Sequence, residues 1–322
     1  MSASPQPDAP RASGEVRVSV VMPLYNAQAY VEAAVRSVLA SDLEAFELIV
    51  VDDGSQDRSA EIVAAIEDPR IVLLRMPASG GPSRPRNAGI AHARAPYVAF
   101  LDSDDLLGRE TLSASIAGLD AYPQAALTLS DYESIDPEGR QIQPSVHVDY
   151  PTLAGLVSHK VAADAWQLIT QPQFAYALLF ENFISTSGLV VRRHLLRTVG
   201  PFDESLVYSE DRDMWFRLAH QSGALYRQRC GLSRRLRPGS LSFGPQIRNA
   251  NDRITVLRRE RGRWQDRAAL RQIDRRIAEN LGAIGYEERG HHRGRALAMF
   301  ARAYATSPEL RWLRGLLGSL LP

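Results

Sequence analysis

The sequence predicts an α/β fold in which a mainly parallel sheet is covered by helices. Two observations support this prediction. Apolar runs rich in β-branched residues alternate with helical stretches from residue 16 to residue 101, and these runs are nearly continuous instead of alternating with polar residues. Such strands are buried on both faces, so helices must lie on each side of the sheet. With 322 residues, of which 45% are hydrophobic and 23% charged, the chain can bury a sizeable core.

The expected elements follow the chain in a regular order at first. We expect strands at 16–22, 46–51, 71–76 and 97–101, separated by helices at 27–40, 59–66 and 86–93. Asn26 directly precedes the first helix, and its side chain suits an N-cap. After residue 107 the rhythm changes, and we expect strands at 125–130 and 189–191 and a helix at 210–220. From about residue 247 the pattern is helical and rich in arginine.

Charge is distributed unevenly, although the net charge is only +1. Residues 1–224 carry a balance of −12 and residues 225–322 a balance of +13. The first 14 residues are rich in Pro, Ser and Ala and resemble a disordered tail. We therefore expect a tail over 1–14, an α/β domain over 15–245 and a helical, Arg-rich C-terminal extension over 246–322. The few aromatic residues of the extension do not alternate regularly with its arginines, and it has no nucleic-acid motif, so we expect no nucleic-acid partner.

Several classes of site and location are disfavoured by what the sequence lacks. The single cysteine, Cys230, excludes an internal disulfide, and the seven histidines have no zinc-ligand spacing. No stretch approaches the roughly 18–20 apolar residues of a membrane span, and the N-terminus lacks the apolar core of a signal peptide. A cytoplasmic protein is the expectation.

Polar residues follow the expected strands at the points where these strands end. Tyr25 and Asn26 follow the first strand, Asp52 and Asp53 the second, and the segment 102–105 the fourth. Ligands bind at the carboxyl ends of parallel strands, so we expect these side chains to meet at one edge of the sheet. Aspartate oxygens are hard ligands of Mg²⁺ or Mn²⁺, and a cation held there can carry a diphosphate.

Five segments together resemble the family 2 glycosyltransferases of the GT-A fold. They are VVMPLYN at 20–26, VVDDGS at 50–55, RNAG at 86–89, FLDSDD at 100–105 and SEDRDMW at 209–215. Each motif is weak by itself, but the five occur in the family's order and on the expected strand ends, over roughly residues 16–245. The resemblance implies a GT-A fold, a Rossmann-like mixed sheet flanked by helices. It also implies a hexosyltransferase-type enzyme that moves a sugar with inversion from a nucleotide diphosphate, expected to be UDP, to an acceptor hydroxyl.

The resemblance assigns roles on the donor side of this reaction. It makes Asp104 the main ligand of the divalent cation and places Asp102 near the ribose or the cation, with Asp105 as the alternative ligand. The other interpretation is that Asp104 or Asp105 caps a helix. Nucleotide-binding residues implied by the resemblance, or expected beside them, are Pro23, Tyr25, Asn26, Asp52, Asp53, Arg86 and Arg237. Asp53 matches the residue that bonds the uracil ring. The alternative for Asp52 is an Asx-turn with Gly54, and the alternative for Tyr25 is a position in the core.

The catalytic base is expected in the segment 209–215. The resemblance makes Asp211 the base, with Glu210 and Asp213 as neighbours able to take the role, although acidic residues also favour any first helical turn. Trp215 is expected in the core. Arg237 stands where the family often has a histidine before Pro-Gly-Ser, which removes a possible metal ligand and leaves open a direct contact of Arg237 with the diphosphate.

The expected acceptor is a growing surface glycan or its lipid-linked precursor, as in polysaccharide biosynthesis. The processive synthase motif Gln-x-x-Arg-Trp is not matched, because Glu260 precedes Arg263 and Trp264, so a single transfer is expected. Two alternatives are a non-catalytic nucleotide-sugar-binding protein and a nucleotidyltransferase, although a nucleotidyltransferase needs a Gly-rich loop after the first strand. The leucine-rich segment 309–322 packs on the protein or a partner, or it contacts an anionic membrane. No pattern indicates an oligomeric state.

Overall fold

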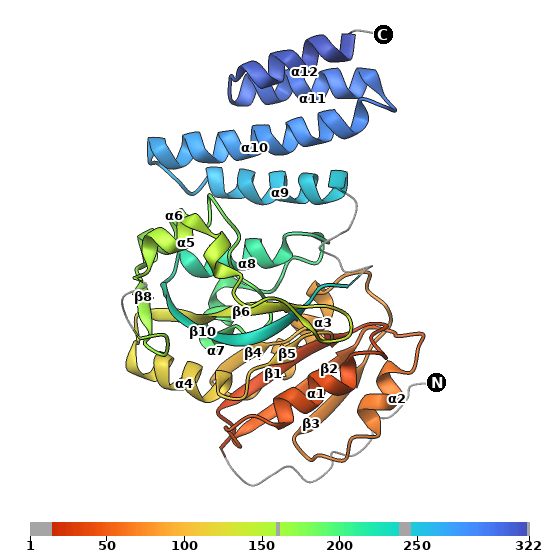
Figure 1. Cartoon of the computed structure of the whole chain (residues 1–322), viewed down its shortest axis with the longest axis vertical. Coiled ribbons are helices and arrows are strands. Elements are labelled where there is room, and N and C mark those ends of the chain that lie inside the picture. Colours follow the sequence, from red (N-terminus) through yellow and green to blue (C-terminus); the bar gives the residue numbers. More distant parts are fainter. Residues whose placement is uncertain (1–14, 159–161, 238–245, 321–322) are drawn as a thin grey trace.

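A computed structural model describes residues 15–158, 162–237 and 246–320 of the chain, and the expected tail at 1–14 lies outside these residues. Within them, ten strands form one mixed sheet (Figure 1). Its main path runs β3 (Ile71–Arg75), β2 (Phe46–Asp52), β1 (Val18–Leu24), β4 (Tyr97–Phe100), β9 (Val190–Arg192), β6 (Ala125–Ile135), β10 (Gly223–Arg235) and β5 (Leu106–Leu107). Two short strands, β7 (Gln141–Gln143) and β8 (Gln167–Ile169), pair with β6 and β10.

The first four strands are parallel, as the sequence predicts, and β9 is the antiparallel strand that joins them to the second half of the sheet. The helices that cover the sheet are α1 (Val31–Leu39), α2 (Ser59–Ala64), α3 (Ser83–His92), α4 (Thr111–Ala121), α5 (Pro151–Leu156), α6 (Gln171–Ala177), α7 (Arg193–Val199) and α8 (Glu210–Ala219), with a 3₁₀ turn at His147–Asp149. The mixed α/β class expected from the sequence is confirmed.

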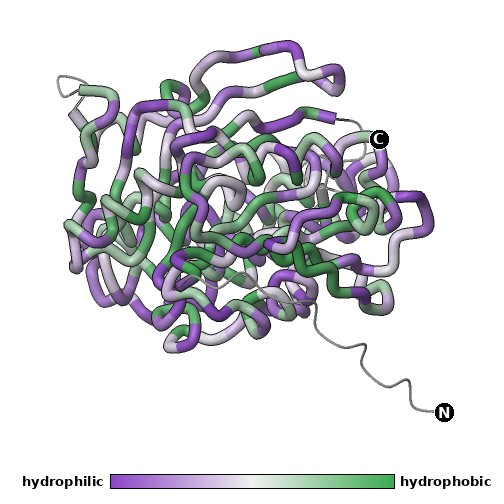
Figure 2. Tube along the Cα trace, turned by 90° about the horizontal axis from the view of Figure 1, so that it is seen from below, coloured by the Kyte–Doolittle hydropathy of each residue, from purple (hydrophilic) through white to green (hydrophobic). Residues whose placement is uncertain are grey.

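Alternate residues of the central strands pack into two hydrophobic clusters, one on each face of the sheet. On β1, Val20 and Met22 belong to the cluster under α1, whereas Val21 faces the opposite cluster, which includes Phe100 and Trp215. This two-sided burial explains why the strand sequences are nearly continuous in apolar residues. Figure 2 shows these hydrophobic segments running through the middle of the molecule. Trp215 is fully buried there, as expected.

The expectation that Asn26 caps the first helix is wrong. Helix α1 begins at Val31, and Asn26 adopts a left-handed conformation with φ of 47°. Its Oδ1 accepts a hydrogen bond of 2.8 Å from the backbone N–H of Gln56, and its own N–H donates to Ser55 Oγ at 3.1 Å. Asn tolerates this conformation better than most residues, so its short amide side chain links the loops after β1 and β2.

Four C-terminal helices lie beyond α8 as a stack, α9 (Gln246–Arg261), α10 (Arg267–Glu288), α11 (Arg293–Thr306) and α12 (Leu310–Leu320) (Figure 1). The helical extension expected from the sequence is therefore present. Its first helix is joined to α8 by an ion pair between Arg259 and Asp213 at 2.9 Å. The buried Glu260 also forms a hydrogen bond of 2.7 Å with His220, the residue that follows α8. The larger hydrophobic cluster also continues without a break from the sheet into these helices.

Helix α12 exposes three of its leucines and keeps Leu316 packed against the larger hydrophobic cluster. Trp312 is buried on its inner side, where a Cβ added to Gly282 of α10 would lie 2.1 Å from the indole ring. Leu310, Leu317 and Leu320 are 71%, 63% and 65% exposed. Leu316 thus packs on the protein, which is one of the alternatives expected for this segment, and the three exposed leucines leave a contact with a partner or a membrane open. The small residues Gly315 and Ser319 are buried on the inner side of the helix. In the described part of the chain, we find no helix with the length and hydrophobicity that crossing a bilayer requires.

Close packing of α3 on β1 explains the glycine of the RNAG segment, because a Cβ on Gly89 would lie 2.4 Å from Val21 Cγ1. We predict that Gly89→Ala lowers the free energy of unfolding by about 1–3 kcal/mol, since α3 must move off β1. Urea unfolding measures the change. The matched control is Gly294→Ala on α11, where no atom lies within 4 Å of the added methyl group. The control should lose no stability, and equal losses in both variants would contradict the packing argument.

Candidate functional site

A cavity of about 840 Å³ lies at the carboxyl ends of the parallel strands, between the sheet, α8 and the first two C-terminal helices. This is the edge at which α/β sheets bind ligands. The predicted site residues that line the cavity are Pro23, Tyr25, Asn26, Asp53, Arg86, Asp102, Asp104, Glu210, Asp211 and Arg237. Segments as far apart in the sequence as Pro23 and Arg237 thus contribute to one cavity.

Asp52 is the predicted residue that the structure does not bring to the cavity. It is the last residue of β2 and is buried, and its Oδ1 accepts the backbone N–H of Ser55 at 3.1 Å. The turn between these residues needs the next glycine, because Gly54 has φ of 73° and a Cβ there would lie 2.7 Å from the N of Ala78. The Asx-turn interpretation of Asp52 is the one that its contacts support.

The carboxylate of Asp53 is held by a residue that the sequence analysis did not single out. Its Oδ1 accepts the backbone N–H of Ser79 at 2.9 Å and its Oδ2 the hydroxyl of Ser79 at 2.8 Å. These bonds fix the orientation of the carboxylate at the cavity wall. Nearby, Tyr25 is 53% exposed, so the interpretation as a core aromatic is wrong.

Arg86 connects three of the sequence motifs. It is 4% exposed, and its Nη2 contacts Asp102 Oδ1 at 2.8 Å while its Nη1 contacts Glu210 Oε1 at 2.7 Å. Burial alone would lower the pKa of Arg86, but the two carboxylates outweigh burial and raise it. The sequence suggested a direct contact of Arg86 with ligand oxygens. In the structure its guanidinium ties the end of β4 to the start of α8, and Arg86 also lines the cavity, so its contact with a ligand stays a prediction.

The three aspartates after β4 have different surroundings. Asp105 is buried, and its Oδ1 accepts a hydrogen bond of 2.8 Å from the backbone N–H of Arg235. Burial is the main cause that raises the pKa of Asp105 to about 8, and the negative charges of Asp104 and Asp102 add to it. Burial, and after it the charge of Asp102, also raises the pKa of Asp104. The helix-cap interpretation is excluded, because the next helix, α4, begins only at Thr111. Asp102 and Asp104 are therefore the better-placed pair for a cation.

The surroundings of this pair fit a divalent cation. Two carboxylates that face one cavity repel one another, and a bound cation would remove this repulsion. Within the described ranges, three or more ligating side chains do not gather at any point. A cation held by Asp102 and Asp104 would therefore need further oxygens from a bound phosphate or from water, which is how Mg²⁺ is commonly bound beside phosphates.

Arg237 is the basic partner of Asp104, with Nε 2.6 Å from Asp104 Oδ2. Its guanidinium lies 5.5 Å from the centre of the Tyr30 ring, and that of Arg235 lies 5.1 Å from the same ring. Tyr30 thus supports both arginines beside the aspartates. The sequence does not indicate this role, because Tyr30 fits the apolar face of the helix expected at 27–40. The Pro-Gly-Ser segment after Arg237 lies outside the described residues.

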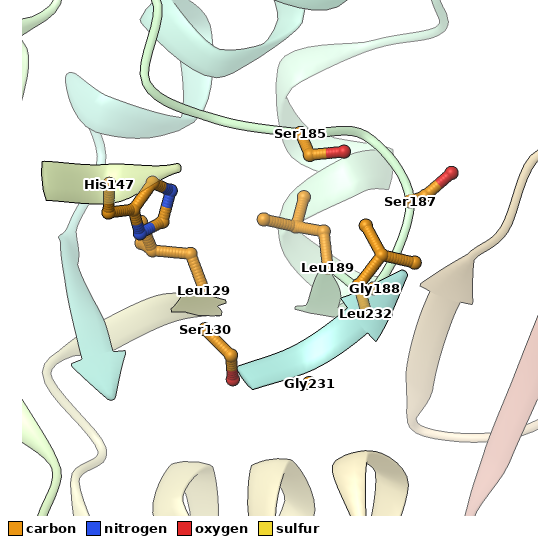
Figure 3. A pocket seen from close by; sticks show the side chains of 9 residues that line it. All are labelled: Leu129, Ser130, His147, Ser185, Ser187, Gly188, Leu189, Gly231 and Leu232. Atoms are coloured by element: carbon orange, nitrogen blue, oxygen red, sulfur yellow. The ribbon is translucent and has the colours of Figure 1, made fainter. Parts of the chain in front are cut away.

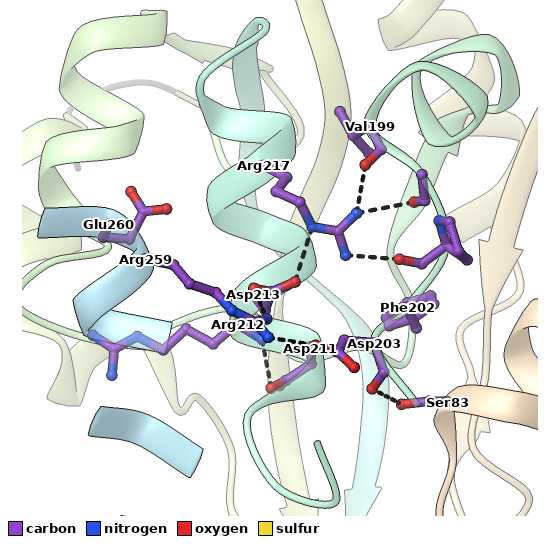
Figure 4. A network of polar contacts seen from close by, with 12 residues as sticks. Ser83, Val199, Phe202, Asp203, Asp211, Arg212, Asp213, Arg217, Arg259 and Glu260 are labelled. Atoms are coloured by element: carbon purple, nitrogen blue, oxygen red, sulfur yellow. Dashed lines mark hydrogen bonds and ion pairs between the residues drawn. The ribbon is translucent and has the colours of Figure 1, made fainter. Parts of the chain in front are cut away.

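Among the three acidic residues at the start of α8, Asp211 is the one best placed to act on a ligand. Asp213 contacts Arg217 and Arg259, both at 2.9 Å, and does not line the cavity (Figure 4). Glu210 is buried against Arg86, and burial together with the charge of Asp211 raises the pKa of Glu210 to about 7. Asp211 is only partly buried, and the side chain that contacts its carboxylate is Asn182, at 3.4 Å.

Backbone strain coincides with the same cavity. In the described chain, two residues other than glycine have a positive φ, Asn26 at 47° and Ser209 at 64°, and both line the cavity. Ser209 directly precedes Glu210 and Asp211. Such conformations cost roughly 1–3 kcal/mol and concentrate at functional sites. The strain is therefore independent support for this cavity as the site.

A second, much smaller void lies under the loop 184–188 and is not a ligand site. Its volume is about 10 Å³, the size of about one water molecule. Figure 3 shows His147 and Leu129 on one side of the void, with Ser187 pointing out of it. Ser187 Oγ accepts the backbone N–H of Asp102 at 3.0 Å, so this loop positions the aspartate segment.

Comparison with known sequences identifies relatives of the N-terminal part. Residues 19–176 match the family model for Glycosyl transferase family 2. An uncharacterized glycosyltransferase of Haemophilus influenzae is 36% identical over 141 residues, which are 42% of this chain and 56% of that protein. The succinoglycan biosynthesis protein ExoO of Rhizobium meliloti is 32% identical over 198 residues, 60% of this chain and 53% of ExoO. The chain spans about half the length of these curated relatives.

Solved structures resemble nearly the whole chain. S. aureus TarS 1–349 in complex with UDP has a TM-score of 0.64 at 18% identity, covering 94% of this chain and 89% of that chain. The mannosyltransferase PcManGT from Pyrobaculum calidifontis, in complex with GDP-Man and Mn²⁺, has a TM-score of 0.58 at 18% identity, covering 98% and 82%. At these identities the likeness concerns the fold alone, and it confirms the predicted GT-A fold class.

The central place of Arg86 can be tested by removing its charge. We predict that Arg86→Gln lowers the free energy of unfolding by about 3–5 kcal/mol, because Asp102 and the buried Glu210 lose their common partner. Urea unfolding at pH 7 measures the loss. Arg84→Gln on the exposed side of the same helix is the control and should change stability by less than about 0.5 kcal/mol. A loss below about 1 kcal/mol in Arg86→Gln would contradict the assigned role.

Proposed function

Because residues 19–176 match the model for Glycosyl transferase family 2, we propose that the chain transfers a single sugar from a nucleotide diphosphate to an acceptor hydroxyl, with inversion at the anomeric carbon. The observation that carries the proposal is the cavity of about 840 Å³, in which Asp102 and Asp104 face the same space as Asp211. Its volume is within the range of small-molecule sites, and its polar groups come from the strand ends and from α8.

The donor side of the cavity would hold the nucleotide diphosphate. Asp53, fixed by Ser79, would accept an N–H of the nucleobase, and Tyr25 is exposed enough to contact the base. Asp102 and Asp104 would hold a divalent cation, Mn²⁺ or Mg²⁺. When bound, such a cation stabilises the negative charge on a departing diphosphate. Arg237 stands beside Asp104 and would place a further positive charge at the same oxygens.

On the acceptor side, Asp211 would remove the proton from the hydroxyl group that attacks the sugar. The buried pair of Arg86 and Glu210 holds the first turn of α8, so the carboxylate of Asp211 is set in a fixed position. An in-line attack requires the hydroxyl to approach from the side opposite the diphosphate, which is why the base must come from a different chain segment than the cation ligands. This arrangement gives inversion.

For the donor we propose a UDP-sugar, and for the acceptor a growing surface glycan. Support for UDP comes from TarS, which has been solved with UDP and with UDP-GlcNAc. Support for a cation comes from PcManGT, solved with Mn²⁺, although its nucleotide is GDP-Man. ExoO is named for succinoglycan biosynthesis, which supports surface polysaccharide as the acceptor class.

We also propose that α12 contacts the inner face of an anionic membrane. Its exposed side carries Leu310, Leu317 and Leu320, and residues 289–320 contain six arginines and one carboxylate, Glu309. A symmetric contact between two copies would bring these like charges together, whereas anionic lipid headgroups attract them. Binding there would hold the enzyme where a lipid-linked acceptor is found.

The donor and cation assignments predict the behaviour of Asp104→Ala. UDP with Mn²⁺ should raise the melting temperature of the wild-type protein, and this shift should disappear in Asp104→Ala because one of two cation ligands is lost. Thermal-shift titration with UDP and GDP, with and without Mn²⁺, measures it and compares the two bases. Asp164→Ala, at an exposed carboxylate outside the cavity, should keep the full shift. An unchanged shift in Asp104→Ala would refute the cation site.

Asp211→Asn separates catalysis from binding in the same series. We predict that it keeps the shift with UDP and Mn²⁺ but lowers kcat for transfer or donor hydrolysis by about 10²–10⁴-fold, because the base is lost. Turnover close to that of the wild type would exclude Asp211 as the base. Absence of turnover in the wild-type protein, with intact UDP binding across the donor panel, would favour the non-catalytic alternative.

Membrane contact predicts flotation with vesicles that contain phosphatidylglycerol, and none with pure phosphatidylcholine. The double variant Leu317→Ser and Leu320→Ser should no longer float, because the inserted apolar area is removed. Ile142→Ser replaces a 57% exposed apolar residue on β7 and is the matched control, which should float normally. Equal flotation of all three proteins would show that α12 is not the contact.

A further inference from the structure

The part of the cavity next to the C-terminal helices carries positive charge that the proposed reaction does not use. Three arginines line it, each from a different helix, namely Arg212 of α8, Arg253 of α9 and Arg276 of α10. They lie beside Asp211, on the side where the acceptor must approach. The amide side chains of Asn182 and Asn249 line the same region.

These arginines have few anionic partners. Arg212 is 8% exposed, and its Nη2 donates to the backbone oxygen of Leu178 at 2.6 Å, while its buried Nε has no partner. Arg276 contacts Glu279 at 3.0 Å, but Glu279 is also shared with Arg311 at 3.2 Å. Within the described part of the chain, Arg253 forms no hydrogen bond or ion pair and keeps its guanidinium free at the cavity wall.

The positive charges also act on one another. Burial, followed by the charges of Arg276 and Arg253, lowers the pKa of Arg212 to about 10. Burial and the charge of Arg276 lower the pKa of Arg253, and Asp211 is the carboxylate that opposes both shifts. The three arginines converge on one part of the cavity, where Asp211 is the carboxylate that acts on both Arg212 and Arg253, and they are held there against their mutual repulsion. An anion bound among them would relieve it.

We propose that Arg212, Arg253 and Arg276 form an acceptor subsite that binds a phosphate group, so that the acceptor is a phosphate-bearing saccharide or a lipid-linked saccharide phosphate. The inference rests on the proposed function, because it places the acceptor next to Asp211. A phosphate suits the site better than a carboxylate, since it presents three oxygens in different directions to donors that come from three helices.

The donor diphosphate is not the intended occupant of this cluster. The donor phosphates are placed by Asp102 and Asp104, which follow β4, whereas the arginines come from α8, α9 and α10. In-line transfer puts the leaving diphosphate and the attacking hydroxyl on opposite sides of the sugar. A second anion site next to the base therefore anchors the acceptor and orients its hydroxyl.

The test is calorimetric titration of glycerol 3-phosphate into the full chain, first without nucleotide and then with saturating UDP and Mn²⁺. Arg253→Gln is the informative variant, because Arg253 has no structural partner to lose. Arg258→Gln, exposed on the same helix and outside the cavity, is the matched control. We expect wild type and Arg258→Gln to bind equally, and Arg253→Gln to bind about tenfold more weakly, since a charge-assisted contact is lost.

Several results would overturn the proposal. They are no binding of glycerol 3-phosphate by the wild type, equal binding by all three proteins, loss of binding when UDP and Mn²⁺ fill the donor site, or preference for glucuronate over the phosphate. Comparing glucose 1-phosphate with a short-chain prenyl phosphate identifies the source of the group, and tight binding of either supports the subsite. Failure of UDP and Mn²⁺ to bind would count against the proposed function instead, because the titration without nucleotide still reports on the arginines.

Discussion

Arg86 is a permanently charged side chain that lies almost entirely out of contact with solvent. Its burial is tolerable because Asp102 and Glu210 approach it at 2.8 and 2.7 Å, from the end of β4 and the start of α8. These two segments are more than 100 residues apart in the sequence, and they carry the proposed cation ligands and the proposed base. One ion-paired guanidinium therefore fixes the relative position of the two halves of the site, and the reaction geometry depends on it.

Around this link the cavity is divided by charge. Carboxylates after β4 face one part of it, balanced by Arg237, whereas unbalanced arginines from α8–α10 face the other. The proposed divalent cation with a diphosphate would satisfy the first part, and the proposed anionic acceptor would satisfy the second. The C-terminal helices are therefore more than an appendage, because α9 and α10 supply Arg253 and Arg276 to the cavity wall. The ion pair of Arg259 with Asp213 and the hydrogen bond between Glu260 and His220 attach α9 to α8 and help to hold these arginines in place.

Much of the fold and part of the site can be predicted from the sequence, for identifiable physical reasons. Continuous apolar strands and polar strand ends are local signals, and they predict that Asp53 and Asp104 lie at one edge of the sheet. Asp211 starts a helix and was assigned through the resemblance of segment 209–215, and the structure places it in the same cavity. Tyr30 and Ser79 were missed because their roles, supporting Arg237 and fixing Asp53, arise from contacts across the sheet edge that no spacing encodes. Arg253 was missed for another reason. In a helix with many arginines, only the packed structure distinguishes the one that faces the cavity from those that face solvent.

The central claim is that Asp102 and Asp104 hold a cation that carries a diphosphate, in front of Asp211. The most direct measurement is the anomalous difference map of a crystal grown with UDP and MnCl₂. We predict one strong manganese peak within about 2.5 Å of a carboxylate oxygen of Asp104 and in contact with the diphosphate. A peak bound elsewhere, or UDP bound in the cavity with no manganese between it and these carboxylates, would contradict the account.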